Sequence, residues 1–284
     1  MSRLSILPPA ADYNRRVRQS PEYARRFGGI ERLYGGGALA RAAAAHVTVV
    51  GIGGVGSWAV EALARSGIGR LTLIDLDHVA ESNINRQVQA LASTLGAAKV
   101  LAMRVRILAI NPDCTVDTVE EFIDERNPPA LVPPCDAVID AIDHVRAKAA
   151  LIAHCRRAGI RIVTTGAAGG RTDPTRIEVL DLARTAQDAL ASRVRALLRK
   201  EYGFTREPKK KFGVECVHSP EQVRRGAGAV PGDTAAHNFC QDPAAPAFDP
   251  GAGLNCAGYG SSVVVTAGFG FAAAARVLAG ILPA

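Results

Sequence analysis

The stretch VTVVGIGGVGSWAVEALA, residues 47–64, joins an apolar β-branched run to an amphipathic helical pattern through four glycines. Glycines at a strand-to-helix turn let the backbone approach a phosphate group. Gly51, Gly53 and Gly56 fit the spacing G-x-G-x-x-G, and Asp75 follows about 20 residues later, where an acid would hold a ribose hydroxyl. Because any nucleotide-binding protein of this type needs the same turn, the stretch leaves a redox dinucleotide and ATP as alternatives.

A polar segment follows the second predicted strand and decides between them. The sequence DLDHVAESNINRQ, residues 75–87, combines carboxylates, amides and a guanidinium, and Lys99 begins the next predicted helix. A hydride-transfer site needs an apolar face for the nicotinamide, with few fixed cations beside the phosphates. Arg86 and Lys99 are suited instead to binding a triphosphate and stabilising the charge that develops as pyrophosphate leaves. These residues favour ATP.

Two acidic side chains close the predicted strand at 135–143. Asp140 and Asp143 are expected at the same edge of the sheet as the glycine turn, and carboxylates are ligands that Mg²⁺ prefers. The alternative is that they belong to separate helix caps and surface ion pairs. Since phosphate-binding, cationic and acidic groups converge on one edge, we predict an ATP–Mg²⁺ site there.

Strand-like and helix-like patterns alternate along most of the chain. Strands are predicted at 45–51, 70–77, 114–122, 135–143, 160–166 and 176–183, and helices at 58–67, 96–111, 145–159 and 186–203. This alternation predicts a doubly wound α/β fold with a mostly parallel sheet covered by helices on both faces. Residues 207–219 are predicted as a cationic loop, and residues 220–253 as a long flexible loop rich in Gly, Pro and Ala.

Composition and charge narrow the class of protein. The chain has 284 residues, of which 48% are hydrophobic and 21% charged, as in globular proteins, and its net charge of +7 favours an anionic partner such as nucleic acid. The N-terminus lacks the apolar core of a secretory leader, which predicts a cytoplasmic protein. Residues 258–282 are apolar, but their glycines and Arg276 favour a buried or interface helix over a membrane anchor.

Several motifs resemble one family. VVGIGGVGS, LIDLD, the N-x-N-R-Q run that ends at Gln87, Lys99 and DAIDHVRAK are similar to the ubiquitin-activating-enzyme-like superfamily of ATP-dependent adenylating proteins, which includes ThiF, MoeB and HesA. Four longer stretches resemble its tRNA threonylcarbamoyladenosine dehydratase branch (TcdA, also called CsdL), and they cover residues 25–35, 164–195, 212–219 and 254–271. The resemblance implies an N-terminal tail at 1–21 and one adenylation domain at 22–284, with a flexible insertion at 204–255 and a C-terminal apolar helix.

The resemblance also implies roles for particular residues. Those expected to bind the nucleotide are Gly53, Gly54, Asp75, Asp77, Asn83, Arg86, Gln87, Lys99 and Asp143. Arg86 and Lys99 would stabilise phosphate charge, and Asp143 would be the metal-linked acid. In several relatives an arginine before the first strand reaches the ATP of the partner subunit, so a homodimer is expected. Arg26 and Arg32 are both candidates for this role, and either one is alternatively a surface cation.

The activity implied is the ATP-dependent dehydration of the threonylcarbamoyl group on the adenosine just 3′ of a tRNA anticodon, through activation of its carboxylate. The runner-up is an adenylyltransferase for a ubiquitin-like sulfur-carrier protein, with a sulfur-relay protein as a further possible partner. Many relatives of that kind hold zinc with two C-x-x-C pairs, which this chain lacks. Cys216 and Cys256 lie in stretches that match the dehydratase branch, and both are predicted to be structural because ring closure needs no thiol nucleophile.

Overall fold

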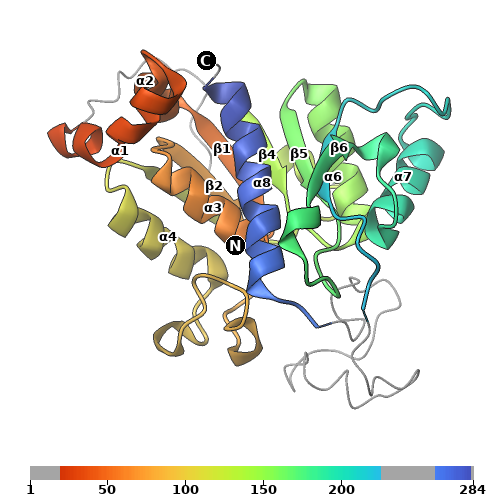
Figure 1. Cartoon of the computed structure of the whole chain (residues 1–284), viewed down its shortest axis with the longest axis horizontal. Coiled ribbons are helices and arrows are strands. Elements are labelled where there is room, and N and C mark those ends of the chain that lie inside the picture. Colours follow the sequence, from red (N-terminus) through yellow and green to blue (C-terminus); the bar gives the residue numbers. More distant parts are fainter. Residues whose placement is uncertain (1–19, 225–259, 283–284) are drawn as a thin grey trace, which may run out of the picture.

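The computed structural model describes residues 20–224 and 260–282, in which helices cover both faces of one sheet (Figure 1). The helices are α1 (Pro21–Tyr34), α2 (Ala38–Ala44), α3 (Gly56–Arg65), α4 (Lys99–Ile110), α5 (Pro128–Leu131), α6 (Val145–Ala158), α7 (Ala189–Glu201) and α8 (Val263–Ile281). The strands are β1 (His46–Val50), β2 (Arg70–Ile74), β3 (Thr115–Val119), β4 (Ala137–Asp140), β5 (Arg161–Thr165), β6 (Glu178–Asp181) and β7 (Glu215–His218).

The strand order is β3-β2-β1-β4-β5-β7-β6. All neighbouring pairs are parallel except β6 and β7, which run antiparallel at one edge. The order reverses between β1 and β4, where Val50 pairs with Asp140. In doubly wound sheets ligands bind outside the carboxyl ends of the strands at such a reversal. The topology therefore places the candidate site beside the ends of β1 and β4.

Two hydrophobic clusters cover the two faces of the sheet. On one face Val47 and Leu71 belong to a cluster with side chains of α3, α4 and α8, and on the other Val138 and Ile162 belong to a cluster with side chains of α6 and α7. All five residues of β1 are buried, as is typical of a parallel strand covered on both sides. The predicted doubly wound α/β class is confirmed.

The observed elements are generally shorter than predicted, and two differences change the description of the sheet. The strand predicted at 70–77 ends at Ile74, so that Asp75 and Asp77 lie beyond it, at the carboxyl edge of the sheet. The prediction of residues 207–219 as a loop was wrong, since β7 lies within them, between β5 and β6. Val214 and Val217 are fully buried, but the lysines before them obscure this short apolar run in the sequence. Most of the loop predicted at 220–253 and all of residues 1–19 lie outside the described residues.

Helix α8 packs along α3 (Figure 1). A Cβ atom at Gly270 would lie 2.5 Å from the Val55 carbonyl oxygen, so a glycine is needed for this close approach. Among the described residues α8 is the one helix long and apolar enough to cross a membrane, and 44% of its most apolar window is buried inside the protein. Its packing against α3 buries part of its surface, and the choice between a buried helix and a membrane anchor stays a prediction. The same packing brings the start of α8 next to the glycine turn.

Candidate nucleotide site

The glycine turn between β1 and α3 borders the space beyond the carboxyl ends of β1 and β4, which we call the crevice. Gly51 has a φ of +85°, and a Cβ atom there would lie 2.9 Å from the Ala141 carbonyl oxygen. A Cβ at Gly56 would lie 1.8 Å from the Gly51 carbonyl oxygen. By contrast, a Cβ at Gly53 would meet nothing within 4 Å. Gly51 and Gly56 therefore shape the turn, whereas Gly53 borders open space in which a phosphate can approach the backbone.

Asp75 joins the end of β2 to the glycine turn. Its buried carboxylate accepts hydrogen bonds from the backbone N–H groups of Ile52 (2.6 Å) and Asp77 (2.8 Å). Burial raises the pKa of Asp75, and the nearby Lys99 ammonium and the two N–H donors oppose that rise. The carboxylate thus fixes the backbone of the turn, and each oxygen keeps a lone pair for a further donor such as a ribose hydroxyl.

Lys99 is the first residue of α4 and lies almost fully buried beside Asp75. Its ammonium is 2.7 Å from a carboxylate oxygen of Asp77, whose side chain is half exposed. The cation is therefore held at the carboxyl edge of the sheet by a partner that faces solvent. A phosphate oxygen entering the crevice would find a fixed positive charge at this point.

Arg86 lies against the other side of the turn. Its Cγ would be 3.3 Å from a Cβ atom at Gly54, and its guanidinium donates to the carbonyl of Ser82 (2.6 Å) and the side-chain oxygen of Asn85 (2.9 Å). Both acceptors belong to the segment that carries Arg86, so the guanidinium can leave them for a phosphate oxygen without unfolding that segment. Arg86 and Gly54 are therefore brought together, as a phosphate site requires.

The amide side chains of the segment 83–89 mainly hold its backbone. Asn83 is buried and its side-chain oxygen accepts from the Ala80 N–H (3.1 Å). The Gln87 side-chain oxygen accepts from Gln89 (3.2 Å), and Gln89 also donates to the Ile52 carbonyl (2.9 Å). Asn83 and Gln87 thus shape the crevice, and their direct contact with nucleotide stays a prediction.

Sequence reasoning missed two supporting residues. Gln89 is almost fully buried and binds the Ile52 carbonyl, opposite the bond that Asp75 makes to the Ile52 N–H. Trp58, the only tryptophan of the chain, donates its indole N–H to the Arg86 carbonyl (2.9 Å). The available signals were a polar residue inside the apolar run 88–91 and a lone tryptophan two residues after the turn.

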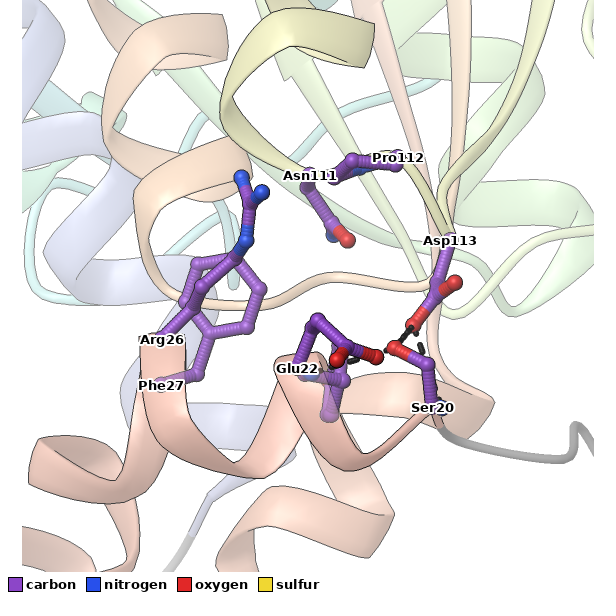
Figure 2. A pocket seen from close by; sticks show the side chains of 8 residues that line it. Ser20, Glu22, Arg26, Phe27, Asn111, Pro112 and Asp113 are labelled. Carbon is purple, nitrogen blue, oxygen red and sulfur yellow. Dashed lines mark hydrogen bonds between the residues drawn. The ribbon is translucent and has the colours of Figure 1, made fainter.

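A small cavity lies elsewhere among the described residues. It has a volume of about 210 Å³ and lies between the start of α1 and the segment 111–113 (Figure 2). That segment precedes β3, so the cavity is at the amino edge of the parallel sheet, opposite the glycine turn. Arg26 lines it and donates to the Ile110 carbonyl (2.9 Å) at the end of α4. The structure therefore does not bring Arg26 to the nucleotide site of its own chain.

Similarity to known proteins covers most of the chain. A model of the ThiF family matches residues 23–279. The chain belongs to the ThiF family. The tRNA threonylcarbamoyladenosine dehydratase of Haemophilus influenzae is 47% identical over 258 residues, which cover 90% of this chain and 93% of the relative.

Solved structures extend the comparison. The Escherichia coli tRNA N6-threonylcarbamoyladenosine dehydratase TcdA in complex with ATP superimposes with a TM-score of 0.80 at 45% identity, covering 93% of this chain and 96% of that protein. That enzyme has also been solved with AMP. The molybdopterin-synthase adenylyltransferase of Escherichia coli is 37% identical, but the match covers only 43% of this chain and 49% of that relative.

One acidic residue predicted near the metal has another role in this ThiF-family chain. Asp140 is fully buried and forms an ion pair with the equally buried Lys148 at 3.0 Å. Its other carboxylate oxygen accepts from the Thr164 hydroxyl (2.6 Å). The prediction that Asp140 and Asp143 together hold Mg²⁺ was therefore wrong for Asp140, because the sequence does not reveal that Lys148 reaches back from α6.

Asp143 remains as the candidate for a metal. It is partly exposed and has no hydrogen bond or ion pair with any residue in the described part of the chain. No group of three His, Cys, Asp or Glu side chains among residues 20–224 and 260–282 is arranged to hold a metal. One free carboxylate still fits Mg²⁺, which is typically bound through one or two carboxylates, water and the phosphates of a nucleotide.

The remaining predicted residues lie away from the crevice or outside the description. Arg32 is exposed on α1, and its side chain has no hydrogen bond or ion pair with any described residue. Cys216 is fully buried in β7, and burial raises the pKa of its thiol, which suits a structural residue and not a nucleophile. Cys256 lies outside the described residues.

Proposed function

We propose that this protein is an ATP-dependent dehydratase that cyclises threonylcarbamoyladenosine next to the anticodon of tRNA. The observation that carries the proposal is the extent of the similarity: the dehydratase matches 90% of the chain, whereas the molybdopterin-synthase adenylyltransferase matches 43%. The crevice supports the ATP part of the reaction, because the open space at Gly53 lies on the same edge of the sheet as Lys99 and Arg86.

The proposed chemistry begins with the free carboxylate of the threonylcarbamoyl group. This carboxylate attacks the α-phosphorus of ATP, and the α–β phosphoanhydride bond breaks to release pyrophosphate and leave an acyl-adenylate. Lys99 and Arg86 would stabilise the negative charge that builds on the departing phosphates. Mg²⁺, held through Asp143 and phosphate oxygens, would supply further charge neutralisation. Support for adenylation over phosphorylation comes from the AMP complex of the Escherichia coli enzyme.

Ring closure completes the proposed reaction. An atom of the ureido group attacks the activated acyl carbon, AMP leaves, and the attacking group loses a proton. The net change is loss of one water from the nucleoside, coupled to conversion of ATP into AMP and pyrophosphate. Because nucleophile and acyl carbon belong to one substrate, their high effective concentration favours closure without an enzyme thiol. The chemistry needs no sulfur-relay partner, and a tRNA substrate is consistent with the predicted cytoplasmic location.

A substrate comparison distinguishes the proposal from the runner-up. AMP formation from ATP should depend on tRNA that carries threonylcarbamoyladenosine, and unmodified tRNA is the control. AMP formation or ATP–pyrophosphate exchange that depends on a carrier protein with a Gly-Gly tail, and not on this tRNA, would instead support the sulfur-carrier adenylyltransferase.

We further propose that the protein acts as a homodimer in which an arginine of α1 reaches the partner's nucleotide. The Arg26 guanidinium is hydrogen-bonded to the carbonyl of Ile110, the last residue of α4, and Lys99 is the first residue of that helix. The 12-residue helix therefore separates Arg26 from Lys99 by about 16 Å within one chain. Arg32 is exposed and has no partner among the described residues, which makes it the better candidate.

Mixed dimers test this arrangement. Combining inactive Lys99→Ala chains with inactive Arg32→Ala chains should restore partial activity, because a mixed dimer contains one site with both native residues. Mixing Lys99→Ala chains with Arg26→Ala chains tests the second candidate arginine in the same way. Absence of rescue by either arginine variant in purified mixed dimers would contradict the proposal.

We propose that tRNA phosphates contact α7 and the lysines that follow it. Arg193 and Lys200 are exposed on α7, and the exposed residues Lys209–Lys211 lie just before β7, at the antiparallel edge of the sheet. In the strand order β7 and β6 lie beyond β4 and β5, on the side of the nucleotide site away from β3. Lys210 forms only an exposed ion pair with Glu207, at 3.8 Å, which a phosphate can replace.

Salt dependence tests the proposed tRNA surface. Replacing Lys209 and Lys211 by alanine should weaken tRNA binding and reduce the slope of log affinity against log salt by roughly one unit for each lost phosphate contact. Arg25→Ala, which removes an exposed cation from α1, serves as the control. If the variant keeps the wild-type slope of log affinity against log salt, this surface does not bind tRNA phosphates.

A further inference from the structure

The turn that carries Asp143 is held by a buried ion pair. β4 ends at Asp140, and Asp143 follows three residues later, just before α6 begins. Lys148, the fourth residue of α6, reaches back to this segment, and its side chain is 2% exposed. Its ammonium lies 3.0 Å from a carboxylate oxygen of Asp140, whose side chain has no exposed surface. Two opposite charges are therefore buried directly behind the candidate metal residue.

The ammonium also binds the backbone of the turn. Lys148 donates to the Ile142 carbonyl (2.8 Å) and lies 3.3 Å from the Asp140 carbonyl. The Asp140 carboxylate accepts from the Ile142 N–H (3.1 Å). Both polar groups of residue 142 are thus held by the ion pair. The three donors of Lys148 are all used, which leaves it none for a ligand.

Neighbouring contacts fix the turn on its remaining sides. The Thr164 hydroxyl on β5 donates to the second carboxylate oxygen of Asp140 (2.6 Å). The Ala141 carbonyl lies so close to Gly51 that a Cβ there would be 2.9 Å away. The segment is therefore wedged between the glycine turn and β5, while the Asp143 side chain that follows it has no hydrogen bond or ion pair among the described residues.

We propose that Lys148 is a positioning residue for the nucleotide-bound metal. It holds the peptide of residue 142 so that the Asp143 carboxylate is presented at the carboxyl edge of β4, and Asp140 neutralises its charge so that the ammonium does not repel Mg²⁺. This inference rests on the metal role given to Asp143 under the proposed function. The proposal explains why a lysine is buried at this position although Lys148 contacts none of the groups proposed to bind phosphate.

Equilibrium binding of a non-hydrolysable ATP analogue, measured with Mg²⁺ and again in EDTA, tests the inference without turnover. The dissociation constant in EDTA divided by the constant with Mg²⁺ reports how much the metal strengthens binding. In Lys148→Met this ratio should fall roughly tenfold, as is typical when a residue that orients a metal ligand is removed, while the constant in EDTA stays within about twofold of the unmodified protein. Arg146→Met is the matched control, since Arg146 is an exposed cation on the same helix, paired with Glu125 at 3.2 Å.

The variants separate the possible outcomes. Asp143→Asn should lower the ratio as Lys148→Met does. If Asp143→Asn lowers the ratio but folded Lys148→Met keeps the wild-type ratio, the role of Lys148 alone is overturned. If both variants keep the wild-type ratio, the metal role of Asp143 is overturned and the inference with it. If Lys148→Met does not fold, the double variant Asp140→Asn/Lys148→Met removes both buried charges together, and it must show the same reduced ratio.

Discussion

Asp75→Ala should weaken ATP binding by at least tenfold. The substitution removes the acceptor proposed for the ribose, and also the two hydrogen bonds that fix the backbone N–H groups of Ile52 and Asp77. A hydrogen bond to a charged group contributes about 1.5–3 kcal/mol, so losing the ribose contact alone predicts a roughly ten- to hundredfold rise in the dissociation constant. Titration calorimetry with ATP measures this directly.

Two further variants make the measurement specific. Asp117→Ala removes an exposed carboxylate that pairs with Arg70 on the same sheet, and it should leave ATP affinity unchanged. Asp75→Asn keeps one acceptor oxygen for the turn and should fall between the alanine variant and the unmodified protein. ATP affinity equal to the unmodified protein in folded Asp75→Ala would remove Asp75 from the nucleotide site.

Gly56→Ala should destabilise the fold, whereas Gly53→Ala should impair only nucleotide binding. The Cβ at Gly56 would lie 1.8 Å from the Gly51 carbonyl oxygen, so the backbone of the turn must move. Overpacking of this kind costs roughly 3 kcal/mol. For a chain of this length that loss lowers the melting temperature by about 6–12 °C.

Gly53 provides the matched comparison within the same turn. Its Cβ would meet no atom within 4 Å, so Gly53→Ala should melt like the unmodified protein. The added methyl group would occupy the open space through which a phosphate approaches, and ATP affinity should fall. Calorimetric melting and ATP titration of both variants check the contrast. Equal melting of the two variants would contradict the steric account of the turn.

The sequence is informative where a pattern is local. The β-branched run of β1, the glycine spacing and Asp75 lie within 30 residues, and they predict the strand, the turn and the edge of the sheet at which the crevice forms. The alternation of strands and helices likewise predicts the parallel sheet. The sequence analysis did not predict β7, because its four residues follow a cationic run and are buried only by β5 and β6 on either side.

Side-chain partners were less predictable because they depend on three-dimensional packing. Asp140 looks like a metal ligand in the sequence, yet Lys148 and Thr164 occupy its carboxylate. Gln89 supports Ile52 across 37 positions of the chain. Arg26 precedes the first strand, as expected of a residue that reaches a neighbouring subunit, but α4 places it at the opposite edge of the sheet from its own crevice. Such partners follow from the fold and not from spacing.

The most direct test of the proposed function is the mass of the modified nucleoside. The purified protein should be incubated with ATP, Mg²⁺ and tRNA that carries linear threonylcarbamoyladenosine, followed by mild digestion and mass spectrometry of the nucleosides. We expect a product lighter than the substrate nucleoside by one water, formed only when ATP is present and absent with the Lys99→Ala variant. An unchanged nucleoside mass with verified substrate and folded protein, together with adenylation of a Gly-Gly-tailed carrier protein, would contradict the dehydratase function.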